Sequence, residues 1–241
     1  MVGVLADIGE RKAAKASARE TAAFRATLSD ALRPLSRPSE SQAAASRALG
    51  HHLGANRAHY VEIEPDDERS VMPDDYAPSL AGRYQLADFP AIIGSCRADR
   101  AFVAPDIAAD PRIGDAEKAR YAALPVAAIA VVPLPKKGRL VALLSVYFDA
   151  PHSWSPGEVA LIEETAGRAW GAIEAMRFER ALRDSEARYR QIVEGAEDLA
   201  IVMFDEGSTV ASWNSGAERI VGLAAHEAIG QLAELVYIPE D

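Results

Sequence analysis

The sequence contains a single cysteine, Cys96, among its 241 residues. One thiol cannot form an internal disulfide, so we predict a reducing, cytoplasmic setting. It also disfavours a zinc site, which usually draws on several cysteines and histidines. A catalytic Cys96 would need a nearby base, and all five histidines lie far from it in the sequence. We therefore interpret Cys96 as a semi-buried structural residue.

Long apolar runs and basic clusters are also missing. No stretch of about 18 or more apolar residues is present to cross a membrane as a helix. The first residues lack the basic segment of a signal peptide. The 26 basic residues are outnumbered by 36 acidic ones, which gives a net charge of −10. This balance disfavours a nucleic-acid-binding surface, because phosphate contacts need clustered Lys and Arg.

The sequence motifs of nucleotide and metal chemistry are absent as well. None of the 16 glycines forms a Gly-x-Gly pair, and there is no Walker lysine and no His-Glu-x-x-His segment. We therefore expect no dinucleotide site, no P-loop and no metal centre of these kinds. No residue is singled out as catalytic, and we interpret the chain as non-enzymatic.

The longest regular pattern runs from Ser155 to Gly195. Ser155 and Glu158 are spaced as a capping box around Pro156, which predicts the start of a helix. Near Met176 the apolar stripe shifts by two residues, which either alters supercoiling locally or marks a change of partner. We favour a change of partner, in which the first half packs on a sheet and the second half faces another helix. The first stripe is Ile162, Ala166, Ala169, Ile173 and Met176; the second includes Phe178, Leu182, Tyr189 and Ile192.

A second connector helix is predicted over residues 11–36, where Pro34 and Pro38 mark its end. Its weak heptad stripe includes Phe24, Leu28 and Ala31. Two interpretations stay open for this stripe: it pairs with a second copy of the chain, or it packs on its own domain.

Between these helices the pattern predicts an α+β domain. Tyr60 and Glu62 alternate with Val61 and Ile63, as expected for a strand. The runs 126–133 and 140–148 do not alternate, so we predict central strands covered on both faces. The other predicted elements are helices at 39–53, 89–97 and 115–124 and strands at 69–72 and 101–104.

The segment from about Pro38 to Arg180 resembles a GAF domain. The matching stretches are Gly82 to Phe89, Val103 to Arg112, and Leu144 to Phe148 followed by Trp154 to Glu158. The resemblance implies an α+β fold with an antiparallel sheet. It places helices on one face of the sheet and loops with short helices on the other.

The two ends resemble parts of PAS domains. The cues are Asp7 to Lys12 in the head, and Arg188 to Glu194, Trp213 to Glu218 and Ile229-Gly230 in the tail. The resemblance implies the following division: 1–10, the end of a PAS-like domain; 11–36, a connector helix; 37–180, the GAF-like domain; 181–195, a continuing connector helix; 196–241, the first part of a PAS-like α+β unit.

GAF-type domains bind small ligands between the sheet and the loop-rich section. The resemblance would place these residues around such a pocket: Tyr60, Arg83, Tyr84, Asp88, Phe89, Cys96, Asp106, Asp110, Arg112 and Tyr121. For Asp110 and Arg112, a turn cap and a surface ion pair are favoured over ligand contact.

No ligand class is singled out by these residues. Cyclic nucleotide is disfavoured because neither Asn56 nor Asn214 is followed by Lys. A covalent bilin is disfavoured because Cys96 is followed by Arg97 rather than His. A flavin adduct is disfavoured because Ile229-Gly230 is followed by no cysteine. As haem ligands, His59 and His152 qualify by residue type only.

These resemblances imply a sensory and dimerisation module of a bacterial signalling protein. We expect the input region of a sensor histidine kinase, which relays a signal through paired helices to a downstream output domain. A structural spacer without ligand and a small GAF-type reductase are the alternatives. The expected partner is a second copy of the chain, through parallel helices.

Overall fold

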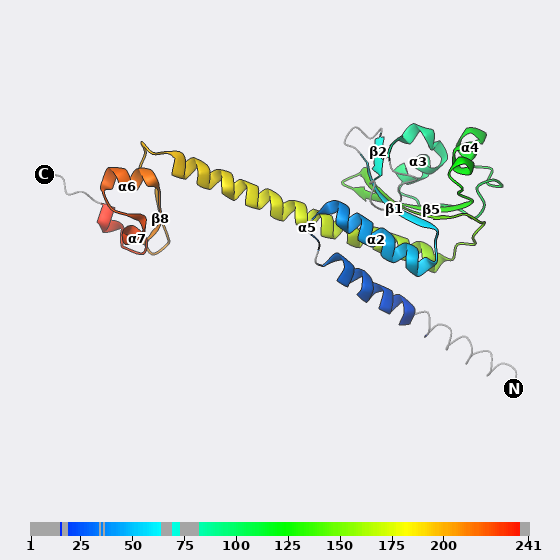
Figure 1. Cartoon of the computed structure of the whole chain (residues 1–241), viewed down its shortest axis with the longest axis horizontal. Helices are drawn as coiled ribbons and strands as arrows, with labels where there is room; N and C mark the ends of the chain where they lie inside the picture. The colour runs from blue at the N-terminus through cyan, green and yellow to red at the C-terminus, as the bar shows by residue number, and fades with distance from the viewer. Residues whose placement is uncertain are drawn as a thin grey trace. The chain divides into compact units, whose positions relative to one another are not determined.

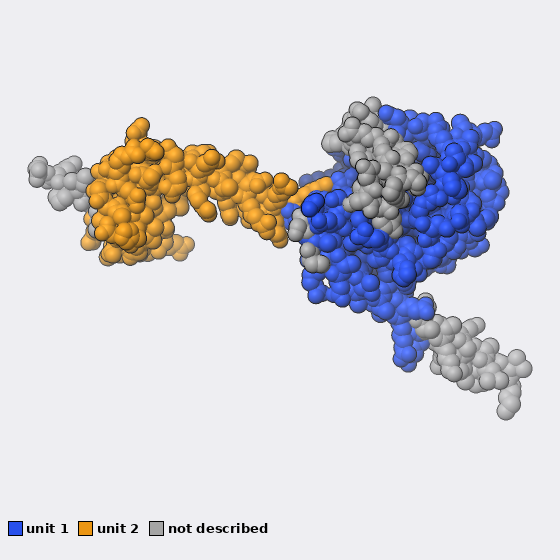
Figure 2. Space-filling model, viewed as in Figure 1, with its two compact units in different colours: residues 1–176 blue, residues 177–241 orange. Residues whose placement is uncertain are grey.

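The computed structural model describes residues 15, 19–33, 35, 37–63, 69–72 and 82–236, with the backbone alone described for 69–72, 82–84, 235 and 236. The chain divides into two compact units, residues 1–176 and 177–241 (Figure 2). Among the described residues, no helix is long and apolar enough to span a membrane.

The first unit is built on a six-stranded antiparallel sheet with the order β3-β2-β1-β6-β5-β4. The central pairing joins β1 to β6, with Tyr60 opposite Leu144. The strands are β1 (Arg57–Ile63), β2 (Arg69–Met72), β3 (Gly82–Gln85), β4 (Phe102–Ala104), β5 (Ala128–Lys136) and β6 (Arg139–Phe148).

Each face of the sheet carries its own apolar core, because successive side chains of a strand point to opposite faces. Helices α2 (Pro38–Leu53) and α5 (Pro156–Gly195) cover one face, where Leu144 and Ile162 are buried. The short helices α3 (Pro90–Arg97) and α4 (Asp115–Ala123) and the 3-10 turn η1 (Leu86–Asp88) cover the other (Figure 1). The predicted arrangement of sheet and helices is confirmed.

The hairpin of β5 and β6 is tighter than the sequence suggested. Lys137 and Gly138 alone form its turn, with φ of 51° and 76°. Strand β5 therefore continues through Pro133 and Pro135, which were predicted to lie at the strand end and in the turn. It pairs with β4 only at residues 129–131, so the prolines lie where β5 is an edge strand. Strand β3 was missed, because this four-residue edge strand depends on pairing with β2.

The start of α5 matches the predicted capping box. Ser155 Oγ accepts from the N–H of Glu158 at 3.2 Å, and Glu158 Oε2 accepts from the N–H of Ser155 at 2.7 Å. His152 stacks on Phe148 with ring centroids 4.0 Å apart, and its Nε2 lies 2.9 Å from Glu158 Oε1. The turn from β6 into α5 is thus held by hydrogen bonds and by the stacking of His152 on Phe148.

Residues 19–32 form a helix that packs within its own unit. Phe24 and Leu28 are buried in the core that α2 and α5 share, and Ala31 is half-buried. The interpretation that Phe24 and Leu28 face a second copy is therefore corrected, because both side chains are covered inside one chain. Arg25 and Glu164 join this helix to α5 at 2.7 Å.

The second unit contains the C-terminal part of α5 and a small α+β cluster. Val210 and Trp213 form its core with Ala217 and Ala228. The predicted PAS-like character of this unit stays a prediction. Its further elements are β7 (Val202–Phe204), β8 (Val210–Trp213), α6 (Ser215–Val221), α7 (Ala225–Ala228) and the 3-10 turn η2 (Ala233–Val236).

Candidate functional site

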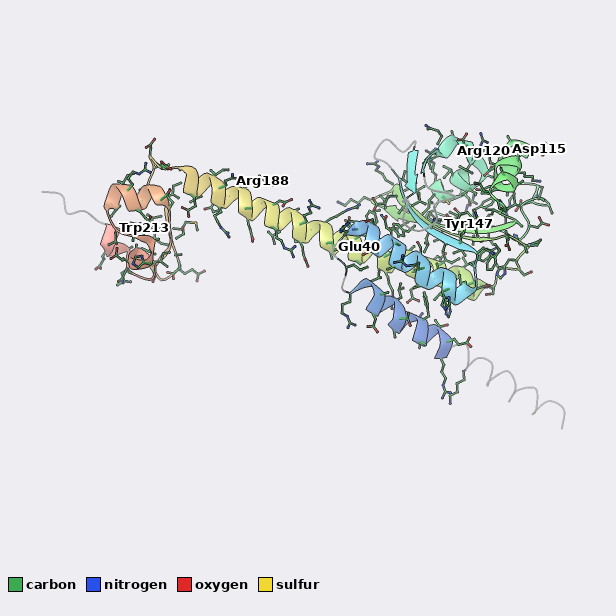
Figure 3. All side chains as sticks on the ribbon, viewed as in Figure 1. Glu40, Asp115, Arg120, Tyr147, Arg188 and Trp213 are labelled. Atoms are coloured by element: carbon green, nitrogen blue, oxygen red, sulfur yellow. The ribbon has the colours of Figure 1, made fainter. Side chains whose placement is uncertain are left out.

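The loop-covered face of the sheet collects several of the predicted pocket residues. Phe89 and Tyr121 contact each other with ring centroids 5.5 Å apart. Cys96 and Tyr121 belong to the buried cluster under α3 and α4, together with Tyr147 from β6. Figure 3 shows Tyr147 on the sheet and Arg120 on α4. This cluster positions aromatic and titratable side chains between two short helices and the sheet.

Glu117 is a central polar residue of this face, and the sequence analysis missed it. Its side chain is 2% exposed, and Oε2 accepts from the N–H of Ala91 at 3.3 Å, in the first turn of α3. No partner is found for Oε1 among the described residues. Burial raises the pKa of Glu117, and the hydrogen bonds from the Ala91 and Ile92 amides partly oppose this.

Asp88, the last residue of η1, and Arg120 of α4 join the turn before α3 to α4 at the surface. Arg120 donates to Asp88 Oδ1 at 2.8 Å and to the Asp88 carbonyl at 3.3 Å. Together with Glu117, these bonds tie the start of α3 to α4. Glu117 and Tyr121 are four residues apart on α4 and share a face, and this spacing was the available signal for Glu117.

Asp110 and Arg112 form a compact clamp in the loop after β4. Asp110 Oδ1 accepts from both the backbone N–H and Nε of Arg112 at 2.9 Å. Arg112 also donates to the carbonyl of Val103 at 2.6 Å and lies 4.5 Å from the ring centre of Phe102. The hydrogen bonds from Arg112 lower the pKa of Asp110. Both side chains therefore hold their own loop, in agreement with the turn-cap interpretation.

Asp106 caps another turn of this loop, because its Oδ1 accepts from the N–H of Ala108 at 3.0 Å.

Tyr60 does not join the predicted group, since it is buried on the opposite, helix-covered face. The prediction that Tyr60 lies near the pocket is therefore wrong. Side chains alternate along β1, so the neighbouring Val61 is the one that points to the loop-covered face. The side chains of Arg83 and Tyr84 lie outside the described residues.

Cys96 has the environment of a structural thiol. It is buried, and burial raises its pKa to about 12. The reactive form of cysteine is the thiolate, so this environment suppresses nucleophilic chemistry at neutral pH.

The two histidines considered as haem ligands contact other side chains of the domain. His152 contacts Glu158, as described, and His59 lies against Tyr147 with ring centroids 5.6 Å apart. Burial, with a smaller contribution from Arg57, lowers the pKa of His59 to about 4. Within the described ranges, no group of three or more His, Cys, Asp or Glu side chains could hold a metal ion.

A surface groove of about 580 Å³ lies beside α3, and none of the predicted pocket residues whose side chains the structure describes line it. Its described lining residues are mostly apolar, with Arg97 as a charged member: Gln85, Leu86, Ala87, Pro90, Ile93, Gly94 and Arg97.

A family model described as "GAF domain" matches residues 38–173. The chain belongs to the GAF domain family. This confirms the predicted resemblance of the central segment. The exact boundaries of the predicted division stay predictions.

Relatives of this GAF protein were found in both sequence and structure. Two-component system protein A of Emericella nidulans is 38% identical over 53 residues, which are 22% of this chain and 8% of that protein. The GAF domain of the Acinetobacter phosphoenolpyruvate-protein phosphotransferase has a TM-score of 0.55 at 9% identity, and the match covers 67% of this chain and 97% of that chain.

The free methionine-R-sulfoxide reductase of Neisseria meningitidis, solved with its substrate, has a TM-score of 0.52 at 16% identity. The match covers 66% of this chain and 93% of that chain. At these identities the likeness of both structures shows the fold alone. The predicted fold class is thereby confirmed.

The closing helix of the GAF domain, α5, provides a second candidate site. Its first stripe is buried in the core at Ile162, Ala169 and Ile173. In the second unit its apolar residues are exposed instead: Phe178 73%, Leu182 50%, Tyr189 53% and Ile192 72%. The first stripe therefore packs on the sheet as predicted, and the prediction that the second stripe faces another helix stays a prediction.

The end of α5 is fixed to the second unit by Asn214. The buried side-chain amide of Asn214 donates to the carbonyls of Val193 at 2.9 Å and Leu199 at 3.0 Å. Its Oδ1 accepts from the N–H groups of Ile201 and Ala217, both at 2.8 Å. We name these contacts the Asn214 joint. They tie the helix end, the residue before β7 and the start of α6 into one body.

Proposed function

We propose that this GAF protein is a non-catalytic regulatory module of a signal-transduction protein and that it acts as a dimer. The observation that carries the proposal is α5. One helix is buried in the GAF core at Ile173 and leaves Phe178 and Leu182 exposed within the next three turns. If one helix belongs both to the sensory core and to the surface between two copies, a change in the core can move that surface.

The exposed stripe favours a second copy of the same chain as its partner. When the exposed Ser185 is counted with Phe178, Leu182, Tyr189 and Ile192, the stripe repeats at alternating steps of four and three residues, the spacing of a two-helix seam. Charges of both signs alternate on one flank: Glu179, Arg183, Glu186 and Arg190. Such a flank does not repel a copy of itself, whereas a single-sign flank would.

The wider setting of the proposal is a sensory array. The partial match to a two-component system protein supports it. We propose PAS-like units at 1–10 and 196–241, connector helices at 11–36 and 181–195, and an output domain such as a histidine kinase in the full-length protein. A cytoplasmic location and the absence of nucleic-acid binding are parts of the same proposal.

The test is the mass of the protein in solution. We expect light scattering at micromolar concentration to give twice the chain mass of 25.8 kDa. Phe178→Glu combined with Leu182→Glu should weaken the dimer by about tenfold or more, because charges would be buried at the seam. Ala187→Glu, also exposed on α5 but outside the stripe, is the matched control and should leave the dimer intact. A monomeric wild-type protein would contradict the proposal.

A small GAF-type reductase is the competing enzyme function. The fold likeness to the sulfoxide reductase suggests this function, and the buried Cys96 with its raised pKa argues against it. A spacer without ligand is favoured by the many side chains that fill the loop-covered face. Native mass spectrometry separates the spacer from a sensor, since a bound metabolite or chromophore would exclude the spacer. An assay of methionine sulfoxide reduction tests the reductase.

A further inference from the structure

Strand β7 of the second unit has an unpaired edge in the part of the chain that the structure describes. Its neighbour in the sheet is β8, on one side only. The Ile201 carbonyl accepts from the backbone N–H directly after β8 at 3.3 Å, and the Asp205 N–H donates to the carbonyl directly before β8 at 2.9 Å. Backbone groups of successive residues point alternately to the two edges of a strand, so those of Val202 and Phe204 point to the open edge.

The side chains along this strand are partly uncovered as well. Met203 is 42% exposed and Phe204 is 44% exposed. Met203 also lines a groove of about 660 Å³, together with Ser212 of β8 and Val193 near the end of α5. An unpaired strand edge beside exposed apolar side chains is the kind of surface to which another extended polypeptide adds.

Acidic residues stand at both ends of the open edge. Residues 191–236 contain eight Asp or Glu residues, a single Arg and no Lys. Glu197 and Asp198 precede β7. Asp205 and Glu206 follow it, and all four are exposed. The edge is therefore flanked by negative charge, which favours a partner with positive charge at the ends of its paired segment.

This charge decides which kind of polypeptide suits the edge. An antiparallel second copy of β7 would bring Asp198 against Glu206, and a parallel copy would bring each of them against itself. Like charges opposite each other destabilise a strand pair. The same charge disfavours a nucleic acid, which also lacks the regularly spaced N–H and C=O groups of a polypeptide.

We propose that the open edge of β7 binds an extended segment of a partner protein that is basic at its ends and apolar between them. The backbone of the partner pairs with the outward N–H and C=O groups of Val202 and Phe204. Its apolar side chains cover Met203 and Phe204, and its basic residues lie near Asp198 and Glu206. The edge belongs to β7 and not to the exposed stripe of α5, so the inference does not rest on the proposed dimer.

The experiment titrates the full chain with a fluorescent synthetic peptide of alternating valine and threonine that carries a pair of lysines at each end. A second peptide is N-methylated along its backbone, which removes the donors needed for strand pairing. A third peptide has glutamates in place of the lysines. In the protein, Phe204→Pro removes the outward N–H, which an edge strand tolerates, and Phe204→Ala is the matched control that retains it.

We expect saturable binding of the lysine peptide. The N-methylated peptide should bind at least about tenfold more weakly, because the hydrogen bonds between backbones are lost. The glutamate peptide should also bind at least about tenfold more weakly, because its ends would meet like charge. Phe204→Pro should weaken binding of the lysine peptide about tenfold more than Phe204→Ala does.

Three results would overturn the proposal. The first is no binding of the lysine peptide, or equal binding of its N-methylated form, a comparison that does not depend on any variant folding. The second is equal binding of the glutamate peptide, which would exclude recognition by charge. The third is a halved mass of the free protein in Phe204→Pro but not in Phe204→Ala, which would mean that a second copy occupies the edge.

Discussion

Glu117 shows how one buried carboxyl can organise a face of the GAF domain. Its Oε2 accepts from a backbone amide at the start of α3, although its own helix is α4. The positive end of a helix favours a carboxylate, whereas burial disfavours it. Burial is the larger effect here, and it raises the pKa of Glu117.

The raised pKa predicts how Glu117→Gln changes stability with pH. A carboxyl with a raised pKa in the folded state destabilises the fold increasingly as pH rises above its ordinary value of 4.5. The stability of the Glu117→Gln variant relative to wild type should therefore increase as the pH rises from 4 to 8, because the amide stays neutral. Urea unfolding at both pH values measures the difference.

Asp115→Asn serves as the control for this prediction, because Asp115 is exposed on the same helix. Its stability relative to wild type should change less between the two pH values. An equal change in both variants would show that Glu117 has no special environment.

At the scale of elements, the Asn214 joint shows how a helix end can be fixed without a large core. One side chain contacts backbone groups before, within and after the turn that follows α5. The neighbouring Ser215 adds a hydrogen bond of 2.6 Å from its hydroxyl to the carbonyl of Glu194. The joint therefore makes the last turn of α5 part of the second unit.

Gly216 is the position at which this joint is most easily broken. A Cβ at Gly216 would lie 2.5 Å from the carbonyl oxygen of Ala196 and nearer still to that of Leu199. Gly216→Ala should therefore displace the joint and destabilise the second unit by about 2 kcal/mol or more. Urea unfolding followed by fluorescence in a background with Trp154→Phe and Trp170→Phe measures the loss, because the remaining Trp213 is buried in that unit.

Gly195→Ala is the matched control for Gly216→Ala. Gly195 ends α5 nearby, but a Cβ there would meet nothing within 4 Å. It should change stability little, and equal losses at both glycines would argue against the joint.

At the scale of the whole molecule, the two units differ in how much apolar surface they bury. The first unit has two apolar cores, one on each face of its sheet. The core of the second unit has only four buried hydrophobic residues among those the structure describes. Since burial supplies most of the stabilising free energy, the second unit should open more readily.

Hydrogen exchange measures this difference directly. We expect the backbone amides of β7 and β8 to exchange at least about tenfold faster than those of β5 and β6, because small cores open with a lower free energy. Equal protection in both sheets would mean that the second unit is stabilised by contacts beyond its small core.

The periodicity of the sequence was sufficient for the elements that span a core. It predicted α2, the alternation along β1 and the burial of β5 and β6 on both faces. It also predicted the shift near Met176, because a covered stripe and an exposed stripe leave different spacings of apolar residues. The family resemblance, and not the periodicity, placed Phe89, Cys96 and Tyr121 on one face of the domain, where they share an apolar cluster.

Only the tertiary structure decided which surfaces meet. Phe24 and Leu28 form a stripe that suits either a second copy or the chain's own core, and packing in space selected the core. Asn214 acts on backbone groups of other elements, so no local pattern marks it. The spacing of Glu117 and Tyr121 marks a shared helix face, but it does not say which backbone amide Glu117 contacts. The spacing of apolar residues indicates that one face of an element is buried, because the residues of that face are themselves apolar. Which element covers that face depends on contacts between residues far apart in the chain.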